Sequence, residues 1–110
     1  MKIPVDAVIA PEKLTRYLLL FREEDDKSKF LSIAGYTLDN PDELETALRD
    51  HIQESEAFEQ KSNVYGSFYE VPGQLKGVNG HILKITSIWL HELANDEFRF
   101  ITLKGRKDET

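Results

Sequence analysis

Residues 77–93, GVNGHILKITSIWLHEL, decide the fold of this chain. The pair Asn79-Gly80 is the strongest short signal for a β-hairpin, because both residue types accept the positive φ angles that a tight hairpin turn needs. After the turn, side chains alternate between two faces of a strand. One face carries Leu83, Ile85, Ser87, Trp89 and His91. The stretch predicts a hairpin and a long strand in which Trp89 anchors the sheet to its helices.

Further strands are expected on both sides of this stretch. Residues 57–75, AFEQKSNVYGSFYEVPGQL, are rich in strand formers but are broken at Tyr65-Gly66 and at Val71-Pro72-Gly73. They predict two strands with a bulge or bend. Residues 94–97, ANDE, form a second turn, and residues 98–105, FRFITLKG, form a last strand. We therefore expect a four-stranded, mainly antiparallel sheet.

The first half of the chain has helical periodicity instead. Residues 10–21, APEKLTRYLLLF, place Leu14, Tyr17, Leu18 and Phe21 on one face of a helix. Residues 27–35, KSKFLSIAG, predict a short helix that closes at Gly35. Residues 40–55, NPDELETALRDHIQES, predict a helix with a capping box. The expected fold is α+β, with three N-terminal helices packed on the four-stranded sheet.

The third of these helices has the clearest boundaries. Asn40 stands at the N-cap position, Pro41 in the first turn, and Glu43 three residues after the cap. The buried stripe of this helix is expected to consist of Leu44, Ala47, Leu48 and Ile52.

Composition limits the class of protein. The 110 residues are 40% hydrophobic and 31% charged, which indicates one globular domain over residues 1–110. There is no cysteine and no apolar run near the roughly 20 residues of a membrane span, so we expect a cytoplasmic protein. The net charge of −6 argues against a generic nucleic-acid binder. Residues 1–60 hold 14 acidic and 7 basic side chains, whereas residues 61–110 hold 6 and 7, so an anionic ligand would meet the second half.

The acidic run in residues 21–30, FREEDDKSKF, is expected to be a solvated connector between two helices. Its carboxylates repel one another and are costly to bury. They lack the glycine and the alternating ligand spacing of a calcium loop. Lys27 and Lys29 relieve part of the repulsion, and Phe30 turns inward to start the next helix.

Few residues point to catalysis. The histidines His51, His81 and His91 lack the close spacing of metal ligands, no serine stands in a nucleophile motif, and the glycines of residues 73–80 lack the order of a phosphate loop. We expect no metal and no cofactor. His91 should share a face with Trp89, with Arg99 across the ladder. Packing at the edge of the core is the favoured interpretation of His91, and acid–base catalysis is the alternative.

Several blocks together resemble a family of small uncharacterised bacterial domains, and they cover nearly the whole chain. The blocks are KLTRYLL, KSKF with a following GY and NPDELETAL, YGSFYEVPGQL, ITSIW and RFITL. Typical members read K-L-T-x-Y-L-L, H-P-x-G-x-x-K-A-x-F-F, Y-G-x-x-Y-x-V-x-G-x-L, T-x-W-I and V-T-A-Y-P. The positions that match are Lys13, Leu14, Thr15, Tyr17, Leu18, Leu19, Lys27, Phe30, Gly35, Tyr36, Tyr65, Gly66, Tyr69, Val71, Gly73, Leu75, Trp89 and Thr102.

The resemblance also has implications for function. Similar domains form the C-terminal ends of polymorphic toxins, and their layout is similar to that of small ribonuclease toxins. Where that family has H-P-x-G, this chain has residues 21–24, FREE, and where it has A-Y-P, this chain has residues 103–105, LKG. A histidine that would act as an acid or base in toxin relatives is therefore missing here.

Two functions follow as hypotheses. The first is a small non-catalytic interaction protein that keeps the fold of toxin-type domains and binds another protein, with Lys27, Tyr65, Tyr69 and Trp89 as candidate binding residues. The second is a divergent, metal-independent ribonuclease that binds RNA with the basic second half. Its candidate catalytic residues are His91, Arg99 and Lys104, with the two tyrosines available for base stacking. A purely structural role of Tyr65 and Tyr69 is favoured over stacking. The partner's identity and the oligomeric state are left open.

Overall fold

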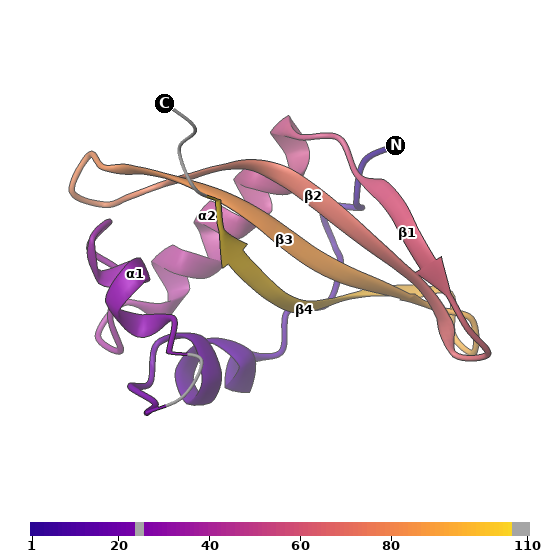
Figure 1. Cartoon of the computed structure of the whole chain (residues 1–110), viewed down its shortest axis with the longest axis horizontal. Coiled ribbons are helices and arrows are strands. Elements are labelled where there is room, and N and C mark those ends of the chain that lie inside the picture. The colour runs from indigo at the N-terminus through magenta and orange to yellow at the C-terminus, as the bar shows by residue number, and fades with distance from the viewer. Residues whose placement is uncertain (24–25, 107–110) are drawn as a thin grey trace.

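A computed structural model describes residues 1–23 and 26–106 of the chain (Figure 1). The elements in chain order are the π-helix η1 (Lys13–Leu18), the α-helices α1 (Ser28–Ser32) and α2 (Pro41–Glu54), and the strands β1 (Phe58–Ser62), β2 (Gly66–Lys76), β3 (Ile82–Glu92) and β4 (Glu97–Gly105). No helix in the described ranges is long and apolar enough to cross a bilayer.

The sheet is an antiparallel meander in the order β1-β2-β3-β4. The predicted hairpin joins β2 and β3, where Gly80 has a φ of 91° and the Gly77 amide donates to the His81 carbonyl over 2.7 Å. The N-terminal segment adds a parallel bridge from Val8 to Arg99 at the outer edge of β4. The four-stranded antiparallel sheet therefore agrees with the sequence.

The predicted layer of three N-terminal helices packed on the sheet is wrong. η1 has six residues and α1 five, so α2, with 14 residues, is the only long helix in the described chain. η1 forms because the Leu19 amide donates to the Leu14 carbonyl, five residues back, over 2.9 Å. This wider turn buries Leu14, Leu18 and Leu19 together and leaves Phe21 60% exposed, whereas a 3.6-residue period had placed Phe21 inside.

The predicted capping box of α2 is also wrong. Asn40 does stand at the N-cap, but its side chain makes no cap hydrogen bond. Its Oδ1 accepts from the Thr37 amide over 2.8 Å, and its Nδ2 donates to the Gly35 carbonyl over 2.9 Å. Asn40 therefore fixes the loop between α1 and α2. Gly35 has the predicted left-handed conformation, with a φ of 85°.

The break expected at Pro72 does not end a strand, because β2 continues through it. β1 pairs with β2 only up to Glu70, opposite Phe58, so Pro72 stands at an edge of β2 beyond β1. The irregularity lies in β1 instead, as a register shift between Glu59 and Lys61. This bulge matters for the surface described below.

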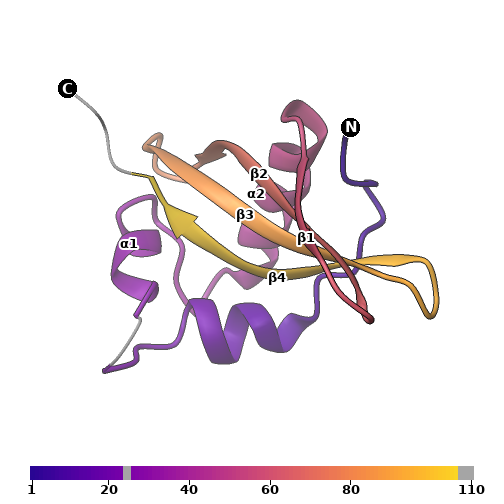
Figure 2. The same ribbon diagram turned by 45° about the vertical axis from the view of Figure 1, so that its right-hand side comes forward.

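The core lies between α2 and one face of the sheet (Figure 2). Trp89 and Phe100 meet edge to face with ring centroids 5.2 Å apart, and both side chains are fully buried. Leu44, Leu48 and Ile52 face them from α2. The predicted role of Trp89 as the anchor between sheet and helices is confirmed.

The acidic connector is only partly described, since Glu24 and Asp25 lie outside the described residues. Glu23 is exposed. Asp26 is not a free carboxylate, because it accepts from the Ser28 hydroxyl over 2.7 Å and from the amides of Ser28 and Lys29. The Ser28 hydroxyl is the main reason why the pKa of Asp26 lies below its ordinary value. Asp26 thus helps to start α1.

Candidate interaction surface

One face of the sheet carries no helix. Figure 1 looks onto this face, with α2 behind the strands. Side chains alternate along β3, so that Leu83, Ile85, Ser87 and Trp89 are buried while the residues between them point the other way. We call the other side the open face. Its residues on the strands are Phe58, Lys61, Phe68, Glu70, Pro72, Gln74, Ile82, Lys84, Thr86, Ile88, Leu90, Glu92, Glu97, Arg99 and Lys104. Lys76 and Thr102 are left out, because their side chains bond Glu54 of α2 and Tyr17 of η1.

None of the residues of the open face is fully buried. Its centre is nevertheless apolar. Phe68 and Leu90 are cross-strand partners, and Ile88 pairs with Glu70, which pairs in turn with Phe58 on β1. Phe58 is 54% exposed. Apolar side chains contributed by three neighbouring strands therefore form a continuous strip with no described segment of the chain packed over it.

Charge on the open face has the opposite sign to the rest of the molecule. With Arg106, whose amide donates to the Lys84 carbonyl, the face holds five basic residues, Lys61, Lys84, Arg99, Lys104 and Arg106, and three acidic residues, Glu70, Glu92 and Glu97. Lys76 is not counted, because its Nζ pairs with Glu54 of α2. The other described residues include 13 acidic and 8 basic ones. The open face is a positive surface on a negative protein.

A groove crosses the apolar strip where β1 bulges. It has a volume of about 250 Å³ and is lined by Gln60, Lys61, Phe68, Glu70 and Ile88. The bulge leaves Gln60 without a partner on β2, whereas Lys61 pairs with Phe68, and the extra residue opens space beside Phe68. Its floor is apolar, and its rim carries one cation and one anion.

The structure does not bring the candidate catalytic residues together. His91 pairs with Phe98 and lies on the same face as Trp89, whereas Arg99 pairs with Leu90 and Lys104 with Thr86 on the open face. Arg99 Nε donates to Glu92 Oε1 over 2.6 Å, and this carboxylate is the main reason why the pKa of Arg99 is raised. The expected ladder contact between His91 and Arg99 is therefore absent.

His91 has partners of its own. Its ring stacks on Phe98 with centroids 4.4 Å apart, and its Nε2 lies 2.5 Å from Asp96 Oδ1. Asp96 occupies the turn between β3 and β4 with a φ of 57°. The pair fastens this turn and also has the geometry of an imidazole oriented by a carboxylate.

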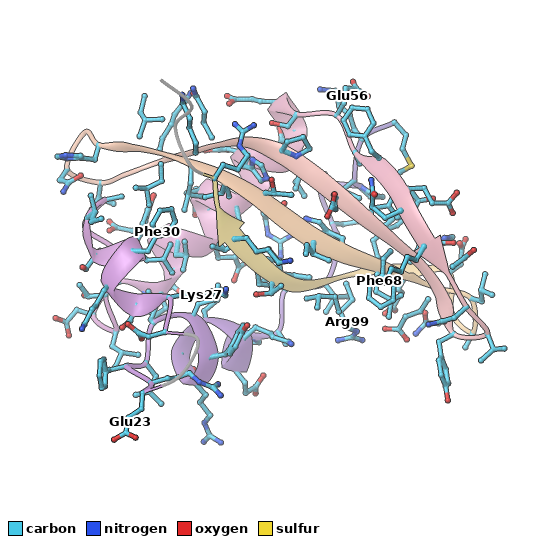
Figure 3. All side chains as sticks on the ribbon, viewed as in Figure 1. Glu23, Lys27, Phe30, Glu56, Phe68 and Arg99 are labelled. Carbon is cyan, nitrogen blue, oxygen red and sulfur yellow. The ribbon has the colours of Figure 1, made fainter. Side chains whose placement is uncertain are left out.

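The candidate binding residues are scattered. Lys27 precedes α1, beside the helices and away from Phe68 on the sheet (Figure 3), and is half-buried. Tyr65 is 73% exposed in the turn between β1 and β2. Tyr69 packs on Phe98 with ring centroids 5.6 Å apart, and Trp89 is fully buried. Tyr69 and Trp89 therefore pack as structural residues, and the four side chains do not form one surface.

A buried polar network links α2 to β3, and its connection to Ser87 and Trp89 was not foreseen. His51 is 1% exposed, and its Nε2 lies 2.8 Å from Ser87 Oγ, which also accepts from Trp89 Nε1 over 2.8 Å. Burial lowers the pKa of His51 to about 4. Leu44 and Leu48 are four residues apart on the buried side of α2, and the same spacing leads to Ile52. The burial of His51, next to Ile52, could be expected from this spacing. Ser87 is fully buried, so this serine–histidine pair is closed to a substrate.

A second cavity lies between α2 and the edge of β2. It has a volume of about 270 Å³, and its acidic lining residues are Glu43, Asp50 and Glu54. Burial, and then the charges of Glu43 and Asp50, raise the pKa of Tyr36, whose hydroxyl donates to the Lys76 carbonyl. Lys76 Nζ lies 3.4 Å from Glu54 Oε1. Within the described ranges, no three His, Cys, Asp or Glu side chains are grouped as metal ligands.

The comparison with protein families gives one match, over residues 4–107, to a domain of unknown function, DUF6883. The chain belongs to the DUF6883 family. No curated protein and no solved structure matches it. The match agrees with the expectation of an uncharacterised domain over nearly the whole chain, and it does not bear on the sequence blocks or on the toxin association.

Proposed function

We propose that this chain is a small non-catalytic interaction protein, related to toxin-type C-terminal domains, that binds another protein through the open face. The observation that supports this function is the apolar strip of Phe58, Phe68, Ile88 and Leu90 with cations at its border. An apolar centre with a polar rim is the usual anatomy of a protein–protein interface. Contiguous exposed apolar side chains in a folded domain mark such sites.

The placement of the reactive side chains supports a non-catalytic role. His91 and the pair Arg99 and Lys104 point to opposite faces of the sheet, so one substrate would not meet all three. Ser87, the only described serine hydroxyl bonded to a histidine, is fully buried. The toxin relation rests on the sequence blocks described above.

Photo-cross-linking tests the proposed surface. Benzoylphenylalanine replaces Phe58 on the open face or, as a matched control, Phe21 in the helical part, which is 60% exposed. In cells that naturally make the protein, irradiation should give a discrete protein adduct from position 58 and none from position 21. The adduct should disappear when Leu90→Asp is added. Adducts at both positions, or adducts unaffected by Leu90→Asp, would contradict the proposal.

A divergent, metal-independent ribonuclease is the second candidate, and the contact between His91 and Asp96 supports it. A carboxylate that orients an imidazole is a frequent arrangement for acid–base catalysis. The test is incubation of purified protein with total RNA beside the double variant His91→Ala, Lys104→Ala. Cleavage that is lost in the double variant would favour the ribonuclease, and the interaction hypothesis predicts no cleavage by either protein.

A further inference from the structure

We infer that the partner of the open face is an acidic protein segment that anchors one large apolar side chain in the groove above Phe68. This inference rests on the proposed function and adds the chemistry of the partner. The groove, the charge of the face around it and the composition of the apolar strip support it.

The charge distribution selects an acidic partner. The open face carries five basic and three acidic residues, whereas the remaining described residues include 13 acidic and 8 basic ones. An acidic segment is attracted to the face and repelled by the rest of the molecule. Such complementarity steers the encounter and disfavours wrong orientations. A second copy of this negatively charged chain would meet the open face only through its helical side, in a head-to-tail contact unlike the two-fold contact of most dimers.

The groove at the β1 bulge supplies an anchor point. Phe68 and Ile88 form its floor, and Lys61 stands at its rim. A large apolar side chain in the groove would complete the packing of Phe68, and a neighbouring carboxylate would meet Lys61. Binding energy in protein interfaces is concentrated in such filled pockets.

The strip favours a protein over RNA. Sequence-tolerant RNA binding needs aromatic rings on which bases stack, together with a groove of cations that follows the phosphates. Beside Phe58 and Phe68 the open face offers the aliphatic side chains of Ile88 and Leu90, and Glu70 stands at the rim of the groove. Glu70 would repel a phosphate backbone that has a charge at every nucleotide, whereas a peptide can place its few carboxylates away from it.

Peptide selection tests the partner's chemistry without knowledge of its identity. Random peptides displayed on phage are selected on the full-length protein at about 0.15 M salt, the physiological ionic strength. Enriched peptides should carry a net negative charge and at least one large apolar residue. Their affinity should fall at least tenfold for Lys61→Glu and for Phe68→Ala, and it should weaken as salt is raised.

Arg16→Glu is the matched control, because Arg16 is exposed on η1, away from the open face, and the substitution changes the net charge of the protein by the same amount. Its affinity for the peptides should equal that of the wild type. Circular dichroism confirms that each variant is folded, and Lys61→Glu alone decides the question if Phe68→Ala unfolds.

Three results would overturn the inference. They are no enriched peptide, enriched peptides that are basic or uncharged, and affinity that survives Lys61→Glu. If a random RNA oligonucleotide instead binds tightly to the wild type and not to Lys61→Glu, that result would also overturn the inference and would identify nucleic acid as the partner of the open face. The cross-link from position 58 does not depend on the charge of the partner. If cross-linking captures a protein but the selection yields no acidic peptides, the inferred chemistry of the partner is rejected and the proposed function is kept.

Discussion

Single residues in this chain act mainly through buried hydrogen bonds. Trp89 was recognisable in the sequence as the anchor of the sheet, because it stands in a long alternating strand. Its indole N–H needs a buried acceptor, and Ser87, two residues earlier on the same face, supplies one. His51 completes this network from α2. The indole of Trp89 is therefore tied to two buried polar residues, one on β3 and one on α2.

Ser87→Ala tests this network. Loss of the hydroxyl leaves Trp89 Nε1 and His51 Nε2 buried without partners, and each such group costs about 1–3 kcal/mol. We expect a clear fall in the free energy of unfolding, measured in urea. Thr86→Ala, which removes the neighbouring hydroxyl on the open face, should cost less than about 1 kcal/mol. Equal effects of the two substitutions would show that the network contributes nothing.

The titration of His51 gives a pH dependence. Burial lowers the pKa of His51 in the folded protein to about 4, from an ordinary value of 6.5 that the unfolded chain keeps. Between these values the unfolded chain binds a proton that the folded chain does not, so the free energy of unfolding falls as pH falls from 6.5 to 4. The full difference is about 3 kcal/mol. The free energy of unfolding, measured by urea titration at several pH values, should depend more steeply on pH between 4 and 6.5 in the wild type than in His51→Gln. The same pH dependence in both proteins would reject the assignment.

At the scale of elements, strands were more predictable than helices. Alternation in residues 82–92 fixed which side chains of β3 are buried, and Asn79-Gly80 fixed the hairpin before it. The helical pattern in residues 10–21 was read with a 3.6-residue period, although η1 has a wider turn that buries Leu18 and Leu19 together. The register shift in β1 could not be predicted from the sequence either, because the position of a bulge depends on how the strand pairs with its partner.

Asn40→Ala tests the corrected role of this residue. Its side chain bonds the Thr37 amide and the Gly35 carbonyl, so the substitution should cost about 1 kcal/mol through lost hydrogen bonds. Amide exchange should speed up at Thr37 and stay unchanged at Asp42 and Glu43, the first turn of α2. Faster exchange at Asp42 and Glu43 alone would instead show that the Asn40 side chain caps α2, as the sequence suggested.

Close packing of α2 on β2 depends on Gly73. A Cβ there would lie 2.4 Å from Ser55 Oγ and 2.8 Å from the His51 ring. Gly73→Ala should therefore lower the free energy of unfolding by about 1–3 kcal/mol. Adding Ser55→Ala should recover only part of the loss, because the contact with His51 remains. A melting temperature equal to that of the wild type would mean that α2 can shift away from β2 without loss of stability.

On the scale of the whole molecule, the sequence indicated where charge lies but not which side chains meet. The basic bias of residues 61–110 was visible, and the sheet turns it into one positive face. The grouping of His91 with Arg99 and Lys104 failed because side chains alternate and the ladder has a register shift between Ile88 and Trp89. The apolar strip escaped notice, since Phe58, Phe68, Ile88 and Leu90 come from three strands whose pairing the sequence does not state.

Lysine footprinting tests the central claim that the open face is the surface that binds a partner. Brief acetylation is read by mass spectrometry for the purified protein and for the protein in native extract of the cells that make it. Lys61 and Lys104 lie on the open face, and Lys2 and Lys29 lie outside it. The account predicts slower acetylation of Lys61 and Lys104 in the extract, with Lys2 and Lys29 unchanged. Protection of Lys2 and Lys29, with Lys61 and Lys104 still fully reactive, would contradict it.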